Sequence, residues 1–104
     1  MLETILKSNR ISQVNAIKAA NLERTFGYQI FKGIKQPSRD TLIKICIGMK
    51  ANTEQTRTLL LKLKAAPLYS KDKRDSVILY GIIHKLNLPE INELLYDNNL
   101  KPLA

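Results

Sequence analysis

The chain has 104 residues, of which 44% are hydrophobic and 25% charged, and this composition is typical of a globular protein and not of a disordered one. We expect one continuous core, because two separate cores of ordinary size would need a longer chain. The single cysteine, Cys46, excludes an internal disulfide. No apolar run is long enough to span a bilayer, so we expect a cytoplasmic protein that does not enter the membrane.

The net charge of +8 is concentrated in the first half of the chain. Residues 1–52 contain nine Lys and Arg against three acidic residues, whereas residues 53–104 contain eight against six. A basic half attracts nucleic acid, an anionic membrane or an acidic protein. Charge alone does not choose among these partners, and a basic face that only maintains solubility explains it equally well.

Apolar residues recur at helical spacing along the whole chain, which predicts an all-α fold. We expect Ser12 and Ser38 to cap the second and fourth helices, and either Ser70 or Asp72 to cap the sixth. Pro89 is expected in the first turn of the seventh helix. In chain order, the expected helices run from residue 2 to about 8, from 13 to the turn at 21, from about 24 to 32, from 39 through 49 and from 53 through 63. The sixth begins at 71 or 73, depending on its cap, and runs through 83, and the seventh runs from about 89 to the Asn pair at 98 and 99.

The second and fourth helices carry the clearest buried faces of the first half. We assign the inward face of the second helix to Val14, Ala16, Ile17 and Ala20, and that of the fourth to Leu42, Ile43, Ile45, Cys46 and Met49.

The C-terminal half is too apolar to form a hairpin that faces solvent. Its apolar stripe consists of Ile78, Ile82, Leu94, Leu95, Leu100 and Leu103. We therefore expect residues 67–104 to pack on a domain of residues 1–66 and to make a smaller dimer contact at their tip. The chain also contains a weak internal similarity, which suggests that a helical hairpin is built twice. It pairs Leu60-Leu61 before Pro67-Leu68 with Leu94-Leu95 before Pro102-Leu103.

The segment Asn21-Leu22-Glu23 predicts a tight turn between the second and third helices, because Asn tolerates the left-handed conformation well. Two helices joined by such a turn are the geometry of a DNA-binding helix-turn-helix. The residues in and around this turn that bear on the family are Ser12-Gln13, Asn21-Leu22-Glu23-Arg24-Thr25-Phe26, Ile30, Gly33, Pro37-Ser38 and Thr41-Leu42-Ile43-Lys44-Ile45. With these residues the chain resembles the Cro and lambda-repressor-like (XRE-type) regulators over about residues 2–60.

The resemblance implies a five-helix DNA-binding domain in residues 1–66, extended by the C-terminal helical hairpin. It also implies a bacterial, phage or mobile-element context. Two residues depart from the family pattern: Ile17 replaces a usual Ala, and Gly27 replaces a usual branched apolar residue. In the family pattern these two positions face each other across the second and third helices. We interpret them as an exchange of volume that preserves the packing of the two helices.

By position in the family, the third helix is expected to enter the major groove. The residues expected to contact bases are Glu23, Arg24, Thr25, Tyr28, Gln29 and Lys32. Arg can bind guanine through two acceptors, Gln can pair with adenine, Glu can accept from cytosine, and the Thr methyl fits thymine. The residues expected to meet phosphates are Gln13, Lys35, Ser38 and Arg39.

Plainer interpretations exist for each of these features. A polar helix face is ordinarily only solvated, and the turn spacing is what favours DNA binding here. His84 has no second ligand at metal-binding spacing, so we expect a packed or surface histidine. No phosphate loop or nucleophile motif occurs, so we expect neither an enzyme nor a cofactor, metal or small-molecule ligand.

Three functions are therefore compared. The leading one is a transcription regulator, expected to be a repressor-like homodimer on double-stranded DNA with an inverted repeat. The second is a protein-interaction adaptor that uses the same basic face for an acidic partner. An RNA-binding module ranks last, because the chain lacks the sheet-borne aromatics and loops of common RNA-binding domains.

Overall fold

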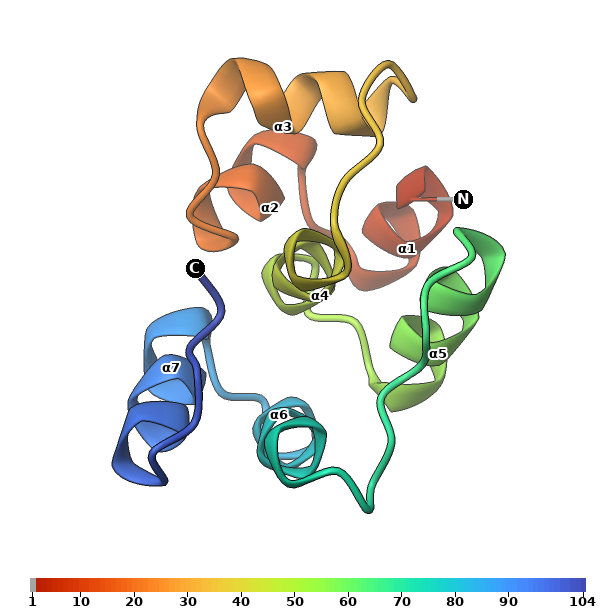
Figure 1. The fold of residues 1–104 in the computed structure, drawn as a ribbon. Helices are drawn as coiled ribbons and strands as arrows, with labels where there is room; N and C mark the ends of the chain where they lie inside the picture. Colours follow the sequence, from red (N-terminus) through yellow and green to blue (C-terminus); the bar gives the residue numbers. More distant parts are fainter. Residues whose placement is uncertain (1) are drawn as a thin grey trace.

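The computed structural model describes residues 2–104, and all of its regular structure in this range is α-helical (Figure 1). Met1, which belongs to the expected N-terminal domain, lies outside the described residues. The helices are α1 (Leu2–Asn9), α2 (Gln13–Ala19), α3 (Arg24–Phe31), α4 (Arg39–Gly48), α5 (Thr53–Lys62), α6 (Lys73–Ile83) and α7 (Leu88–Asp97). The all-α prediction is confirmed. Within residues 2–104 no helix has both the length and the apolar character needed to cross a membrane.

The six helices from α2 to α7 begin at polar caps, and the sequence identified three of them. Ser12 and Ser38 accept hydrogen bonds from the amides of Asn15 and Thr41, and of the two candidates for α6 it is Asp72 that serves as the cap. Asn52 and Asn87 were not predicted as caps. Each forms a capping box with the residue three positions later, Gln55 in α5 and Glu90 in α7.

One three-residue motif recurs in the connections between four helix pairs. It consists of a left-handed residue, an apolar residue and a cap, as in Asn21-Leu22-Glu23 between α2 and α3, where Asn21 has a φ of 55°. Arg10, Lys50 and Lys85 occupy the same position after α1, α4 and α6, with φ values of 56°, 55° and 57°. The left-handed Asn21 is thus confirmed, but the turn that suggested a helix-turn-helix is not specific to α2 and α3.

α4 is the centre of the molecule and contributes to two apolar clusters (Figure 1). All five residues that we assigned to its inward face are buried, as expected. The first cluster joins α4 to α1, α2, α3 and α5, and contains Ile5, Leu6, Ala16, Ala20, Ile30, Ile45, Cys46, Met49, Ala51 and Leu59. The second joins α4 to α5, α6 and α7, and contains Leu42, Ile43, Ile47, Leu60, Ile78, Ile82, Leu88, Ile91, Leu95 and Leu103. The two parts of the chain therefore share the helix between them.

The assignment of Val14 to the inward face of α2 was wrong, because its side chain is 44% exposed. Ala16, Ile17 and Ala20 do face inward. Two residues turn a helix by about 200°, so Val14 lies on the side of α2 nearly opposite Ala16.

Residues 39–68 and 74–103 form an internal repeat with an offset of 35 positions. The identical pairs are Arg39/Arg74, Asp40/Asp75, Ile43/Ile78, Ile47/Ile82, Lys50/Lys85, Asn52/Asn87, Leu59/Leu94, Leu60/Leu95, Pro67/Pro102 and Leu68/Leu103. The weak internal similarity in the sequence predicted a hairpin built twice, but it aligned Leu60-Leu61 with Leu94-Leu95. The correct partners of Leu94-Leu95 are Leu59-Leu60.

The two repeats face each other across an approximate two-fold axis. α4 and α6 lie side by side, seen nearly end-on, with α5 and α7 on opposite outer sides (Figure 1). Two bidentate ion pairs follow the same symmetry: Arg39 binds Asp75, and Arg74 binds Asp40, with shortest distances of 2.8 and 2.9 Å. Each arginine also donates to the two carbonyls before the leucine of its own repeat, those of 66–67 and 101–102.

Candidate nucleic-acid interface

One face of α3 is fixed against α2 by close packing. Ile30 and Gly27 are buried, and a Cβ atom added to Gly27 would lie 2.6 Å from Cγ2 of Ile17. Ile17 itself is buried. The predicted contact between Ile17 and Gly27 is confirmed, and the absence of a side chain at Gly27 gives Ile17 its space. α3 is thus positioned by contacts that do not involve its polar face.

The opposite face of α3 is open to solvent. Arg24, Thr25 and Lys32 are exposed, whereas Tyr28 and Gln29 are half-buried. The guanidinium carbon of Arg24 lies 5.9 Å from the centre of the Tyr28 ring, a cation–π distance between residues one helical turn apart. α3 lies at the end of the molecule remote from α6 and α7 (Figure 1). The C-terminal helices therefore leave this face uncovered.

Glu23 has a different role from the base contact expected for it. It is the N-cap of α3, and its two carboxylate oxygens accept from the amides of Thr25 and Phe26 at 3.0 and 2.9 Å. These two hydrogen bonds favour the ionised form and lower the pKa of Glu23. The carboxylate is turned back toward its own helix, so we remove Glu23 from the base contacts. The sequence did not signal this, because Glu is not among the preferred capping residues.

The residues expected to meet phosphates are spread over three elements. Gln13, half-buried, begins α2, and Lys35 is exposed in the connection from α3 to α4. Ser38 caps α4; its hydroxyl accepts from the amide of Thr41 and donates to the Thr41 hydroxyl oxygen at 3.0 Å. The hydroxyl proton of Ser38 is thus already used within the helix cap.

Arg39 is committed to the ion pair and to the chain after α5. Its Nε donates to the carbonyl of Ala66 at 2.9 Å, and its Nη atoms bind Asp75 and the carbonyl of Pro67. We therefore remove Arg39 from the phosphate contacts. Its partner Asp75 is 36 positions away, and the repeated Arg-Asp pair was the only sequence signal that could have revealed it.

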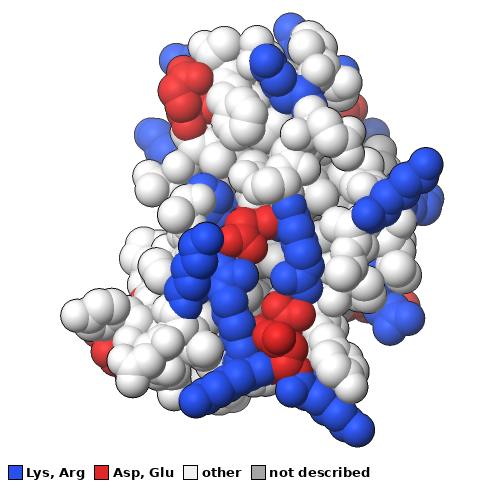
Figure 2. All heavy atoms as spheres, viewed as in Figure 1, with Lys and Arg blue, Asp and Glu red and all other residues white. Residues whose placement is uncertain are grey.

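Positive charge is neutralised in one region and unopposed in another. Lys and Arg alternate with Asp and Glu over the lower half of the face in Figure 2, where α4 and α6 begin. Here the hydrogen bond from Arg74 lowers the pKa of Asp40. In residues 2–104 the only ion pairs are the two between these helices, so Arg24, Lys32 and Lys35 have no acidic partner within 4.0 Å in that range.

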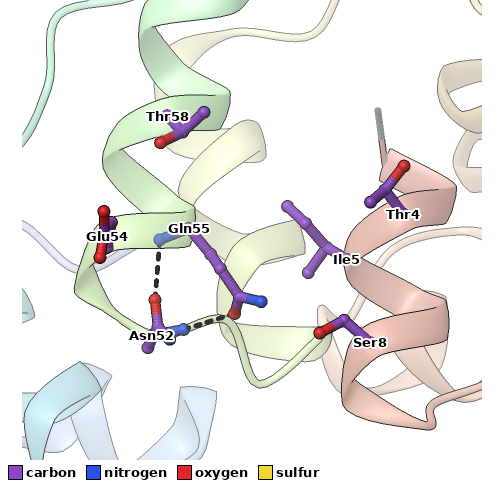
Figure 3. A pocket seen from close by; sticks show the side chains of 7 residues that line it. All are labelled: Thr4, Ile5, Ser8, Asn52, Glu54, Gln55 and Thr58. Carbon is purple, nitrogen blue, oxygen red and sulfur yellow. Dashed lines mark hydrogen bonds between the residues drawn. The ribbon is translucent and has the colours of Figure 1, made fainter.

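A hollow between α1 and α5 is lined mostly by polar residues (Figure 3). It measures about 260 Å³ and is lined by Thr4, Ile5, Ser8, Asn52, Glu54, Gln55 and Thr58. Its best placed polar groups, Asn52 and Gln55, already bond each other in the capping box drawn there. Cys46 is buried, which raises the pKa of its thiol to about 12. Across residues 2–104, no cluster of His, Cys, Asp and Glu could hold a metal ion.

Comparison of the chain with protein-family models, with curated proteins and with solved structures found no match. The function proposed below therefore depends on the residues and geometry of this molecule.

Proposed function

We propose that this chain is a sequence-specific DNA-binding transcription regulator of the lambda-repressor-like helix-turn-helix class, which inserts α3 into the major groove. The observation that carries the proposal is the division of α3 into two faces. Gly27 and Ile30 hold one face against the core, while Arg24, Thr25 and Lys32 project into solvent. A helix held in this way can present side chains to base edges without rearranging.

Each polar residue on the open side of α3 and at its C-cap has a chemical role in this proposal. Arg24 and Lys32 donate to guanine, the Thr25 methyl contacts thymine, and Gln29 pairs with adenine. The ring of Tyr28 supports the Arg24 guanidinium, which reduces the conformational freedom lost on binding.

The phosphate contacts are reduced to two side chains. Gln13 at the start of α2 and Lys35 after α3 flank the reading face and would fix the register of the protein on the duplex. Glu23 and Arg39 act within the protein, Glu23 by capping α3 and Arg39 by fixing the start of α4.

The uncovered position of α3 also bears on the adaptor alternative. A helix face buried by residues 68–104 would have argued for a protein-interaction role, and this face is open. An acidic protein could still bind the same surface, but no feature of the site favours it over DNA.

The test begins with selection of bound duplexes from a random DNA pool. Fluorescence anisotropy on the selected sequence then compares Arg24→Ala, Gln29→Ala and Lys35→Ala with Lys62→Ala, a control that removes an exposed lysine from α5. We expect the two α3 variants to lose about 1 to 3 kcal/mol and to relax preference at one base pair each. Lys35→Ala should weaken all sequences alike and reduce the salt slope by about 1. The control should bind as the wild type does.

Three results would overturn the proposal. They are the absence of any enriched sequence, an affinity independent of salt, and equal losses on all sequences for every variant. The last result would leave only non-specific attraction to a basic surface.

A further inference from the structure

The last turn of α6 exposes large side chains that ordinarily lie in a core. Tyr80 is 52% exposed and Ile83 is 63% exposed. The ring of His84, which ends the helix, lies 4.1 Å from that of Tyr80. An isolated exposed apolar residue is common, but Tyr80 and Ile83 are neighbours on one helix end and the His84 ring packs on Tyr80, so the three form a patch. We call Tyr80, Ile83 and His84 the α6 face.

The internal repeat shows how the equivalent face of α4 is used. The residues that correspond to Tyr80, Ile83 and His84 are Ile45, Gly48 and Met49. All three are buried: Ile45 and Met49 pack with residues of α1 and α2.

At Gly48 the contact is backbone to backbone. A Cβ atom there would meet the carbonyl oxygen of Ala16 and the amide nitrogen of Ala20. The face on α4 is therefore a helix-packing surface covered by α2, and within residues 2–104 its copy on α6 has no such cover.

The surroundings of the α6 face carry opposite charges on its two sides. On one side lies a groove of about 590 Å³ between the repeats, whose lining includes Lys50 and Lys85 together with Ile47, Ile82 and Ile83. On the other side lies a hollow of about 360 Å³, lined by Tyr80 and His84 together with Glu90, Glu93 and Asp97. Leu86 lines both hollows and so lies between them.

We propose that the α6 face is the contact surface for a second copy of this chain, related by a two-fold axis near Ile83. A surface with an apolar centre, a basic side and an acidic side matches itself after a half-turn. The basic groove of one copy then faces the acidic hollow of the other, and the two Ile83 side chains pack together. The Glu90 carboxylate already accepts from the amide of Asn87 in the capping box of α7, so Glu93 and Asp97 are the carboxylates available to the partner's lysines.

This inference goes beyond the proposed function and does not depend on it. α6 lies at the end of the molecule remote from α3 (Figure 1), so a contact through the α6 face leaves α3 uncovered in both copies.

The first experiment measures self-association without DNA. Sedimentation velocity of the full chain, from about 1 to about 100 µM in physiological salt, should show a monomer–dimer equilibrium. Ile83→Glu should raise the dissociation constant at least about tenfold. The matched control is Leu61→Glu on α5, where Leu61 is 49% exposed. It should leave the equilibrium unchanged, and circular dichroism should show both variants folded.

The second experiment tests the pairing of opposite charges across the axis. Lys85→Glu alone and Glu93→Lys alone each place like charges at both contacts, so each variant should be largely monomeric. A mixture of the two variants should form a heterodimer, because both contacts are then between opposite charges. Lys62→Glu is the control: alone it should dimerise as the wild type does, and mixed with Glu93→Lys it should form no heterodimer, because one contact then pairs two lysines.

Each outcome decides the matter. A wild-type chain that stays monomeric at about 100 µM overturns the proposal, as does equal damage from Leu61→Glu or a mixture that fails to associate. Because no DNA is present, failure here leaves the role of α3 untouched. Conversely, a dimer that does not bind DNA would reject the proposed function and keep the interface.

Discussion

The contact between Ile17 and Gly27 can be tested by filling the space that Gly27 leaves. A Cβ atom at position 27 would lie 2.6, 2.8 and 3.0 Å from three carbons of Ile17, all well inside van der Waals contact. Ile17 is 3% exposed and cannot turn away into solvent. We expect Gly27→Val to destabilise the fold by about 1 to 3 kcal/mol, as overpacking of a core does.

Removing the bulk on the other side should relieve this strain. Ile17→Ala alone leaves a cavity and should cost about 2 to 5 kcal/mol. In the double variant the valine occupies part of that cavity, so the combined loss should fall short of the sum by about 1 kcal/mol or more. Urea denaturation followed by circular dichroism gives the four free energies of unfolding that this cycle needs.

The control for introducing valine into α3 is Thr25→Val. Thr25 is exposed and nearly the same shape as valine, so the change should alter stability by less than about 0.5 kcal/mol. Additive losses in the Ile17 and Gly27 cycle would refute the reasoning, because two residues that exchange volume must be coupled.

Three further predictions concern the ion pairs and the buried thiol. Asp75→Ala removes the partner of Arg39 and should cost about 1 to 3 kcal/mol in urea denaturation, because it leaves guanidinium donors unsatisfied in a part-buried position. The pKa of Asp40 in the folded protein lies below its ordinary value of 3.8, so its ionised form contributes stability above that pH and the contribution is lost as the pH falls further. Acid titration of the free energy of unfolding should therefore show a loss below pH 3.8 that is weaker in Arg74→Gln. Cys46, with a buried thiol whose pKa is raised to about 12, should react with a disulfide reagent at pH 8 only as fast as the protein unfolds.

Local features of the fold were largely readable from the sequence because their causes are local. Caps such as Ser12 and Ser38 act within one turn, and Asn21 adopts the conformation that its side chain favours. The missed caps, Asn52 and Asn87, carried the same information in their spacing to Gln55 and Glu90. Both caps were therefore predictable from the sequence.

The hydrogen bonds that engage Arg39 join distant parts of the chain and were not readable from its own helix. Arg39 looks like a phosphate ligand when only its own helix is considered, since it begins α4 beside Lys35 and Ser38. Its partner Asp75 comes from α6, and composition says nothing of that pairing. Glu23 is the opposite case, a local cap formed by a residue type that rarely caps a helix.

The C-terminal helices do not contact the exposed face of α3, but the second repeat helps to position the connection that follows α3. Arg39 is the first residue of α4, directly after the connection that carries Lys35. Its guanidinium is fixed by Asp75 of α6 and by the carbonyls of Ala66 and Pro67, so the end of that connection is held by the second repeat. The symmetry-related pair of Arg74 with Asp40 fixes the same turn of α4 from the other side. The second repeat thus completes the core, fixes the end of the connection between α3 and α4, and leaves α3 uncovered.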